Sequence, residues 1–145
     1  MINVRFFSED VSFTLKHKRK TAHIIDSILE SEKPKSGHVN YIFCSDKYLL
    51  KLNRTFVKHD YYTDILTFED YDENGLLTAD IFISIDRVKE NAKELKESFH
   101  SELIRVIIHG ILHICGYSDH LPAEKIKMRE KENQYIMHFF EESST

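Results

Sequence analysis

Residues 101–120 read SELIRVIIHGILHICGYSDH, and this stretch decides how the chain folds. Its apolar spacing predicts a helix that Ser101 caps, that runs to about Cys115 and that ends where Gly116 takes a left-handed conformation. Four polar side chains share one arc of roughly 80° on that helix: Glu102, Arg105, His109 and His113. Nearly every other position is apolar, so we expect a largely buried helix with one narrow polar stripe.

Two histidines four residues apart lie one above the other on a helix, so both imidazoles can reach one metal ion at about 2.0 to 2.1 Å. An HxxxH pair alone is a weak signal, because it also marks the solvent-facing edge of an amphipathic helix. Here the chain stops at Gly116 and returns two more ligand types, Asp119 and His120. We therefore predict one zinc ion on His109, His113 and either Asp119 or His120.

Three protein ligands with an open fourth position are typical of catalytic zinc, whereas structural sites are usually closed by four. Nickel and manganese also suit imidazole and carboxylate ligands. Gly110 follows His109, so the glutamate that serves as the general base in HExxH metalloproteases is missing. A peptidase mechanism of that type therefore lacks its base.

The composition is that of an ordinary globular protein. The 145 residues are 41% hydrophobic and 30% charged, a length that favours a single domain over residues 1–145. No uninterrupted apolar run approaches the ~18 residues of a membrane span, and the first residues do not read as a signal peptide, so we expect a cytoplasmic protein without membrane contact. The net charge of -4 argues against a protein that coats nucleic acid non-specifically.

The remaining segments predict the other elements of the fold. Strand patterns cover residues 2–7, 38–44, 63–68 and 79–85, and a hairpin through 70–75 joins the last two. Helical spacing covers residues 16–32, 46–56 and 86–97, and Pro122 suits the first turn of a final helix. The prediction is an α+β fold with a mixed sheet of about four strands, about five helices and a metal site at a helix end.

The stretch HGILHICGYSDH, residues 109–120, resembles the HGxLHLxGYDH signature of the YbeY family of metal-dependent endoribonucleases. The resemblance extends upstream. LNRTFVKHDYYTDILTF, residues 52–68, is similar to a family segment that ends in TDVLSF, and ADIFIS, residues 79–84, is similar to the family's GDI strand. Recognisable pattern covers about residues 52–132. It implies a zinc-dependent enzyme that cuts single-stranded RNA, acts in 3'-end maturation of small-subunit ribosomal RNA and in ribosome quality control, and partners the small subunit.

The chain departs from the family pattern in two places. In the ungapped register Asp119 takes the position of the last ligand histidine, and Met128 and Glu132 then match family positions downstream. A one-residue insertion would give that role to His120 instead. Val57 stands where the family usually carries an arginine that is thought to contact the substrate, and Lys58 beside it cannot reproduce bidentate phosphate recognition.

Other residues are weaker candidates. Asp64 is a candidate catalytic or metal-orienting carboxylate, or a turn cap, and Lys58 is a second catalytic candidate. Arg54, Lys58 and His59 are candidate RNA-binding residues, and the run KHKRK at residues 16–20 could also contact an RNA backbone or form a solvated helix face. Two alternatives to the nuclease stay open: a ribosome-assembly protein stabilised by a non-catalytic metal, and a zinc hydrolase of a small molecule or peptide.

Overall fold

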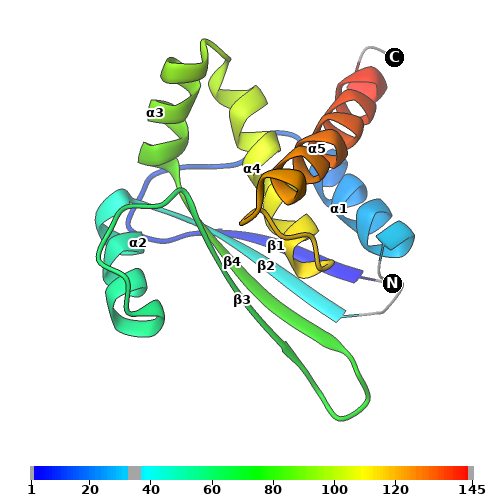
Figure 1. Ribbon diagram of the computed structural model, residues 1–145, viewed down its shortest axis with the longest axis horizontal. Coiled ribbons are helices and arrows are strands. Elements are labelled where there is room, and N and C mark those ends of the chain that lie inside the picture. Colours follow the sequence, from blue (N-terminus) through cyan, green and yellow to red (C-terminus); the bar gives the residue numbers. More distant parts are fainter. Residues whose placement is uncertain (1, 33–36, 144–145) are drawn as a thin grey trace.

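The computed structural model describes residues 2–32 and 37–143 (Figure 1). Its elements are β1 (Ile2–Ser8), α1 (Lys18–Glu32), β2 (Gly37–Cys44), α2 (Asp46–Leu52), the short π-helix η1 (Asn53–Val57), β3 (Ile65–Tyr71), β4 (Leu77–Ser84), α3 (Ile85–Leu95), α4 (Phe99–Ile114) and α5 (Pro122–Ser143). The predicted α+β class, with four strands and five α-helices, is confirmed over these residues. None of the described helices is both long and apolar enough to cross a membrane.

The four strands form one mixed sheet in the order β1-β2-β4-β3. The pairs β1–β2 and β2–β4 are parallel, and β3 pairs antiparallel with β4 at the edge. The predicted hairpin between the last two strands is therefore present, and it places Ile65 opposite Ile83. Because side chains alternate along a strand, this register sends Ile65, Ile81 and Ile83 to the same face.

That face of the sheet carries the hydrophobic core. Ile81 and Ile83 of β4 are fully buried under the helices. Figure 1 shows α1 and α4 above the sheet, with α5 crossing α4. The hydroxyl of the buried Tyr41 donates a hydrogen bond to the carbonyl of Ile107 in α4, at 2.9 Å, so the polar atom inside the core is satisfied.

The central helix α4 begins three residues before the predicted start. Ser98 caps it, not Ser101, because the Ser98 Oγ accepts a hydrogen bond from the backbone N–H of Ser101 at 3.0 Å. Its other end is as predicted: Gly116 has φ 101°, a left-handed conformation that glycine adopts without strain. The backbone N–H of Tyr117 then bonds to the carbonyl of Leu112, which completes the helix end.

Gly110 allows α4 to lie close to β3. A Cβ built on Gly110 would be 2.7 Å from the Ile65 side chain and 3.1 Å from that of Ile81. The absence of a side chain therefore brings the helix against the start of β3, where Asp64 precedes Ile65. This approach sets the distance between the polar stripe of α4 and the edge of the sheet.

Candidate metal centre

Three donor atoms converge beside the second half of α4. The Nε2 atoms of His109 and His113 are 2.8 Å apart, and they lie 3.4 and 3.6 Å from the Oδ2 atom of Asp119. Three ligands at about 2.0 to 2.1 Å from one tetrahedral ion would be separated by roughly 3.3 Å from each other. The donor set, two imidazole nitrogens and a carboxylate oxygen, therefore fits a single ion in both spacing and chemistry.

Two different constraints place these ligands. The histidines are one helical turn apart on α4, so their rings project from the same side of the helix. Asp119 comes from the loop between α4 and α5, after the left-handed Gly116 has turned the chain back. The hydroxyl of Tyr117 in that loop donates to the carboxylate of Glu32 in α1 at 2.8 Å, which ties the loop to the helix layer.

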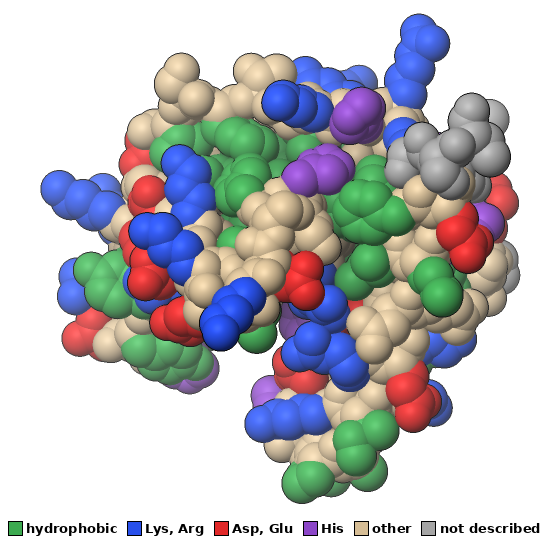
Figure 2. Space-filling view, turned by 90° about the horizontal axis from the view of Figure 1, so that it is seen from above, with side chains coloured by type: hydrophobic (Ala, Val, Ile, Leu, Met, Phe, Trp, Pro, Cys, Tyr) green, Lys and Arg blue, Asp and Glu red, His purple; other side chains and the backbone are tan. Residues whose placement is uncertain are grey.

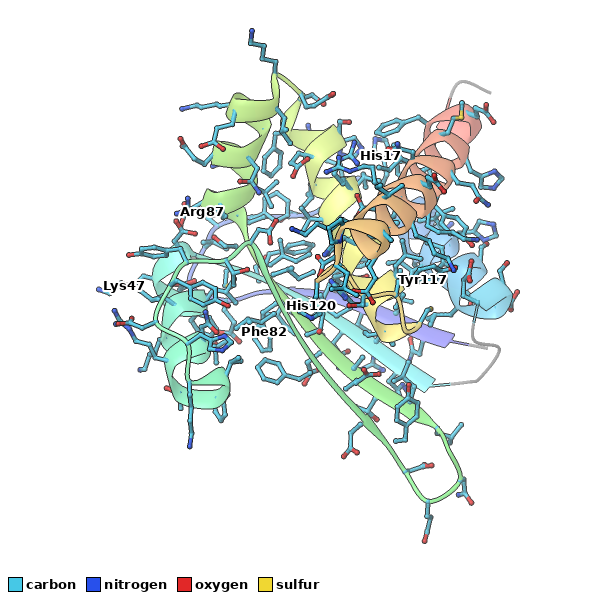
Figure 3. All side chains as sticks on the ribbon, in the orientation of Figure 1. His17, Lys47, Phe82, Arg87, Tyr117 and His120 are labelled. Carbon is cyan, nitrogen blue, oxygen red and sulfur yellow. The ribbon has the colours of Figure 1, made fainter. Side chains whose placement is uncertain are left out.

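The structure separates the two residues proposed as the third ligand. Asp119 is part of the cluster with His109 and His113, and His120 is exposed and outside it. Figure 3 shows His120 near the start of α5, below the upper turns of α4. Among the described residues, His109, His113 and Asp119 form the group that could hold a metal ion.

Glu132 of α5 holds the far side of the His109 ring. Its Oε2 atom is 2.6 Å from the Nδ1 atom of His109, and the glutamate side chain is only 5% exposed. Burial by itself would lower the pKa of His109, but the hydrogen bond and negative charge of Glu132 outweigh burial and raise that pKa. A proton on Nδ1 leaves the Nε2 lone pair directed at Asp119 and His113.

A buried ion-pair network extends from Glu132 along the polar stripe of α4. The guanidinium of Arg105 lies 3.3 Å from Glu132 and 3.5 Å from Glu102, so it pairs with both carboxylates. Glu102 is 3% exposed, and burial raises the pKa of its carboxyl group. The stripe thus continues as one charged network from Glu102 to His109.

Asp64 lines the same cavity as His109 and Asp119, a pocket of about 330 Å³. Its Oδ2 atom accepts a hydrogen bond from the Asn91 side chain at 3.2 Å. Burial raises the pKa of Asp64, which the charge of His109 opposes. The carboxylate therefore faces the candidate metal centre and is held by α3 rather than by a ligand histidine.

The pKa of His113 moves in the opposite direction to that of His109. Burial lowers it first, and the positive charge of His109 lowers it further. The two rings meet at nearly right angles, with centroids 4.4 Å apart. A positive charge on one imidazole therefore disfavours a positive charge on the other, and both nitrogens are directed at the same point.

The basic residues predicted to contact RNA lie in and after η1, outside the lining of this pocket. Arg54 forms an ion pair with Asp60, and the Nδ1 atom of His59 is 3.0 Å from the hydroxyl of Tyr61. Lys58 is exposed and has φ 61°, so it ends η1 in the left-handed conformation. The role of all three in RNA binding stays a prediction.

Sequence reasoning missed two basic residues that do line the pocket. Lys125 and Arg129 project from the first turns of α5 toward the cavity, and both are exposed. The available sequence signal was their spacing of four residues on a helix that begins at Pro122, which places both side chains on one face of that helix. That signal was weak, because nothing in the sequence fixes which face of α5 meets α4.

Together, the fold and the converging donors define an α+β protein with an HxxxH helix and a group of side chains that could hold a metal ion. A model of the family described as Endoribonuclease YbeY matches residues 3–140. A Cytophaga hutchinsonii protein with that name is 47% identical over 88% of this chain and 90% of its own length, and one from Parabacteroides distasonis is 41% identical over 92% and 93%. The solution structure of a Thermotoga maritima protein superposes with a TM-score of 0.66 at 30% identity, over 97% of this chain and 91% of that one. The chain belongs to the YbeY family.

Proposed function

We propose that this protein is a zinc-dependent endoribonuclease that cuts single-stranded RNA at the centre formed by His109, His113 and Asp119. The observation that carries the proposal is the convergence of these three donors, with an open side toward a polar pocket, in a chain whose relatives are named endoribonucleases. A zinc ion supplies Lewis acidity at a phosphoryl oxygen and increases the acidity of water. Nickel or manganese would suit the same ligands.

The protein's own residues would divide the remaining work. Lys125 and Arg129 flank the pocket and would neutralise the phosphates on either side of the scissile bond. Asp64 would accept a proton at Oδ1, because Oδ2 already accepts a hydrogen bond from Asn91. Its raised pKa brings this carboxyl group nearer to the range in which a general base works. These assignments are proposals for this chain.

We further propose that the substrate is ribosomal RNA, with the protein acting in 3'-end maturation of the small-subunit RNA and in ribosome quality control in the cytoplasm. The support is membership of the family together with the motif over residues 109–120. Lys58, Arg54 and His59 would then contact the strand away from the cut. Because Lys58 is exposed and Arg54 has a single exposed carboxylate partner, both can reorient toward an RNA backbone.

One sequence feature supports a non-catalytic alternative. Val57, at the end of η1, occupies the position where the family usually has arginine, so the positive charge expected there must come from Lys58 or from α5. A ribosome-assembly protein that binds RNA and metal without cleavage would tolerate this change. Cleavage must therefore be measured together with metal content.

The test compares wild type with His113→Ala and with His23→Ala, a matched control on the exposed side of α1. Elemental analysis and cleavage of a single-stranded RNA are measured on the same preparations. The proposal expects about one metal ion and RNA cleavage in wild type and His23→Ala, and neither in His113→Ala. If His113→Ala loses the metal but none of the three proteins cleaves RNA, the assembly role is favoured. If the metal content of His113→Ala equals that of wild type, the proposed centre is excluded.

A further inference from the structure

A second pocket, of about 340 Å³, lies between the loop that leads into α1 and the first turns of α4. Its lining combines aromatic and basic side chains. The aromatic rings of Phe13 and Phe99 meet edge to face, with centroids 6.0 Å apart. The basic lining residues are Lys16, His17 and His100. Seen from above, histidine and lysine side chains border a hydrophobic hollow in this part of the surface (Figure 2).

The KHKRK run builds one wall of this pocket through an uncommon backbone conformation. His17 has φ 58°, in the left-handed region that residues other than glycine rarely adopt. Its carbonyl accepts hydrogen bonds from both the backbone N–H and the hydroxyl of the buried Thr21, at 3.0 and 2.9 Å. These bonds fix the start of α1 and hold the His17 ring 5.9 Å from that of His100.

The basic side chains in and beside this pocket lack acidic ion-pair partners among the described residues. Over the described residues, none of the ion pairs involves Lys16, His17, Lys20 or His100. The Nζ atom of Lys20 is buried without a hydrogen-bond partner and lies 4.4 Å from the centre of the Phe139 ring. Burial lowers the pKa of His100, and the charges of His17, Lys16 and Lys20 lower it further. Such an arrangement is relieved by an anion.

This pocket is separate from the metal centre. His100 and His109 are nine residues apart on α4, which at ~100° per residue places them on opposite sides of the helix and about 13 Å apart along its axis. Figure 3 agrees, since His17 lies beside the upper turns of α4 and α5 whereas His120 lies near the start of α5. A ligand in this pocket would leave the metal-binding face free.

We propose that this pocket binds a nucleotide, with the phosphate held by Lys16, His17 and His100 and the base against Phe13 and Phe99. Phosphate offers several acceptor oxygens, which match the several donor side chains that line this one pocket. Bases stack on aromatic side chains without sequence preference. The volume lies within the range of small-ligand sites. The nucleotide is either free or the end of an RNA strand, and both share this chemistry.

The test uses the zinc-loaded protein and adenosine 5'-monophosphate as the probe. Binding is followed through the ring signals of the histidines by NMR. We expect the signals of His17 and His100 to shift and those of His109 and His113 to stay. Adenosine and inorganic phosphate, measured separately, should each bind at least about tenfold more weakly, because each lacks one half of the recognised group.

Two charge reversals on the same run provide the matched comparison. Lys16→Glu, in the pocket, should weaken binding by at least about tenfold, whereas Arg19→Glu, exposed and outside it, should change binding less than about twofold. His17→Asn removes the imidazole with a residue that tolerates the left-handed conformation, and it should also weaken binding. Circular dichroism of each variant verifies the fold.

A 5'-phosphorylated adenosine trinucleotide distinguishes the two sources. Tighter binding than the monophosphate supports an RNA end as the ligand, and equal binding supports a free nucleotide. The proposal is overturned if the signals of His17 and His100 do not move, or if Lys16→Glu and Arg19→Glu weaken binding equally. It is also overturned if adenosine or inorganic phosphate alone binds as tightly as the monophosphate. None of these outcomes depends on RNA cleavage, so they leave the proposed nuclease untouched.

Discussion

Replacing Glu132 with glutamine should weaken zinc binding although Glu132 is not a ligand. The change keeps the side-chain volume and an acceptor near the Nδ1 atom of His109, but it removes the negative charge that makes this 2.6 Å hydrogen bond charge-assisted. Charge-assisted hydrogen bonds contribute roughly 1.5 to 3 kcal/mol and neutral ones roughly 0.5 to 1.5 kcal/mol. The difference of about 1 to 1.5 kcal/mol corresponds to nearly tenfold in affinity, at the lower end of the range of about 10 to 100-fold for residues that hold a ligand histidine.

The assay is competition for zinc between the metal-free protein and a chromophoric chelator at pH 8. At that pH the raised pKa of His109 interferes least, because a proton on its Nε2 atom would compete with the metal. Glu130→Gln is the matched control, since Glu130 is exposed on the same helix and carries the same charge. Thermal unfolding of the metal-free proteins reports separately on the lost ion pair with Arg105.

We expect Glu132→Gln to bind zinc about tenfold more weakly and Glu130→Gln to bind it as wild type does. The reasoning would be refuted if the two variants had the same affinity within about twofold, a difference of ~0.4 kcal/mol. In that case Glu132 would stabilise the helix pair without positioning His109. A fall in thermal stability alone, with unchanged affinity, would lead to the same conclusion.

Three further predictions concern the third ligand, the loop that carries it and the sheet. Asp119→Ala should weaken zinc binding more than Glu132→Gln does, whereas His120→Ala should leave it unchanged; the reverse order in the same chelator assay would assign the site to His120. Burial raises the pKa of Glu32, but the hydrogen bonds from its partners outweigh burial, so the pKa in the folded protein is lowered. Glu32 therefore stabilises the fold above its unfolded pKa near 4.5, and this stabilisation is lost as the pH falls through the lower pKa of the folded protein. The deficit in unfolding free energy of Glu32→Gln should thus shrink below about pH 4.5, and a constant deficit in urea titrations from pH 7 to 3 would contradict it. Gly37→Ala would place a Cβ 2.3 Å from the carbonyl oxygen of Leu77, so urea unfolding should show a loss of about 1 to 3 kcal/mol, and unchanged stability would argue against this packing.

The two helix histidines show what the sequence can predict about this site. Their spacing, the apolar surroundings and Gly116 are local features, and each acts within about one helical turn. The structure places both rings together as that spacing predicts, with Nε2 atoms 2.8 Å apart. The strands and the hairpin between the last two could also be anticipated, because a period of two is as local as a helical turn, whereas the order of the strands in the sheet is not local and was not predicted.

Residues from distant elements could not be predicted in the same way. Glu132 meets His109 across 23 positions, and Glu32 meets Tyr117 across 85. Which face of α5 packs on α4 depends on tertiary packing, and the weak amphipathic pattern of α5 does not determine it. The residue types do not decide where α4 starts, because both Ser98 and Ser101 are good capping residues. The structure has Ser98 as the cap, and Phe99 after it contacts Phe13, which is distant in the sequence.

The opposite pKa shifts of the two candidate ligand histidines, His109 and His113, would link metal binding to pH. Glu132 favours protonation of His109, and the resulting positive charge disfavours protonation of His113. Between their two pKa values, the metal-free pair therefore holds about one proton more than two neutral imidazoles. The 2.8 Å separation of the two Nε2 atoms suits a proton shared between them. A metal ion must displace that proton, because both nitrogens donate lone pairs to it. Glu132 therefore has two opposing effects: it orients His109 and makes it a stronger ligand at high pH, and it strengthens proton competition at low pH. Glu132→Gln should consequently lose affinity most above the raised pKa of His109 and least below it, a pH dependence that a residue serving only to pack α5 on α4 would not produce.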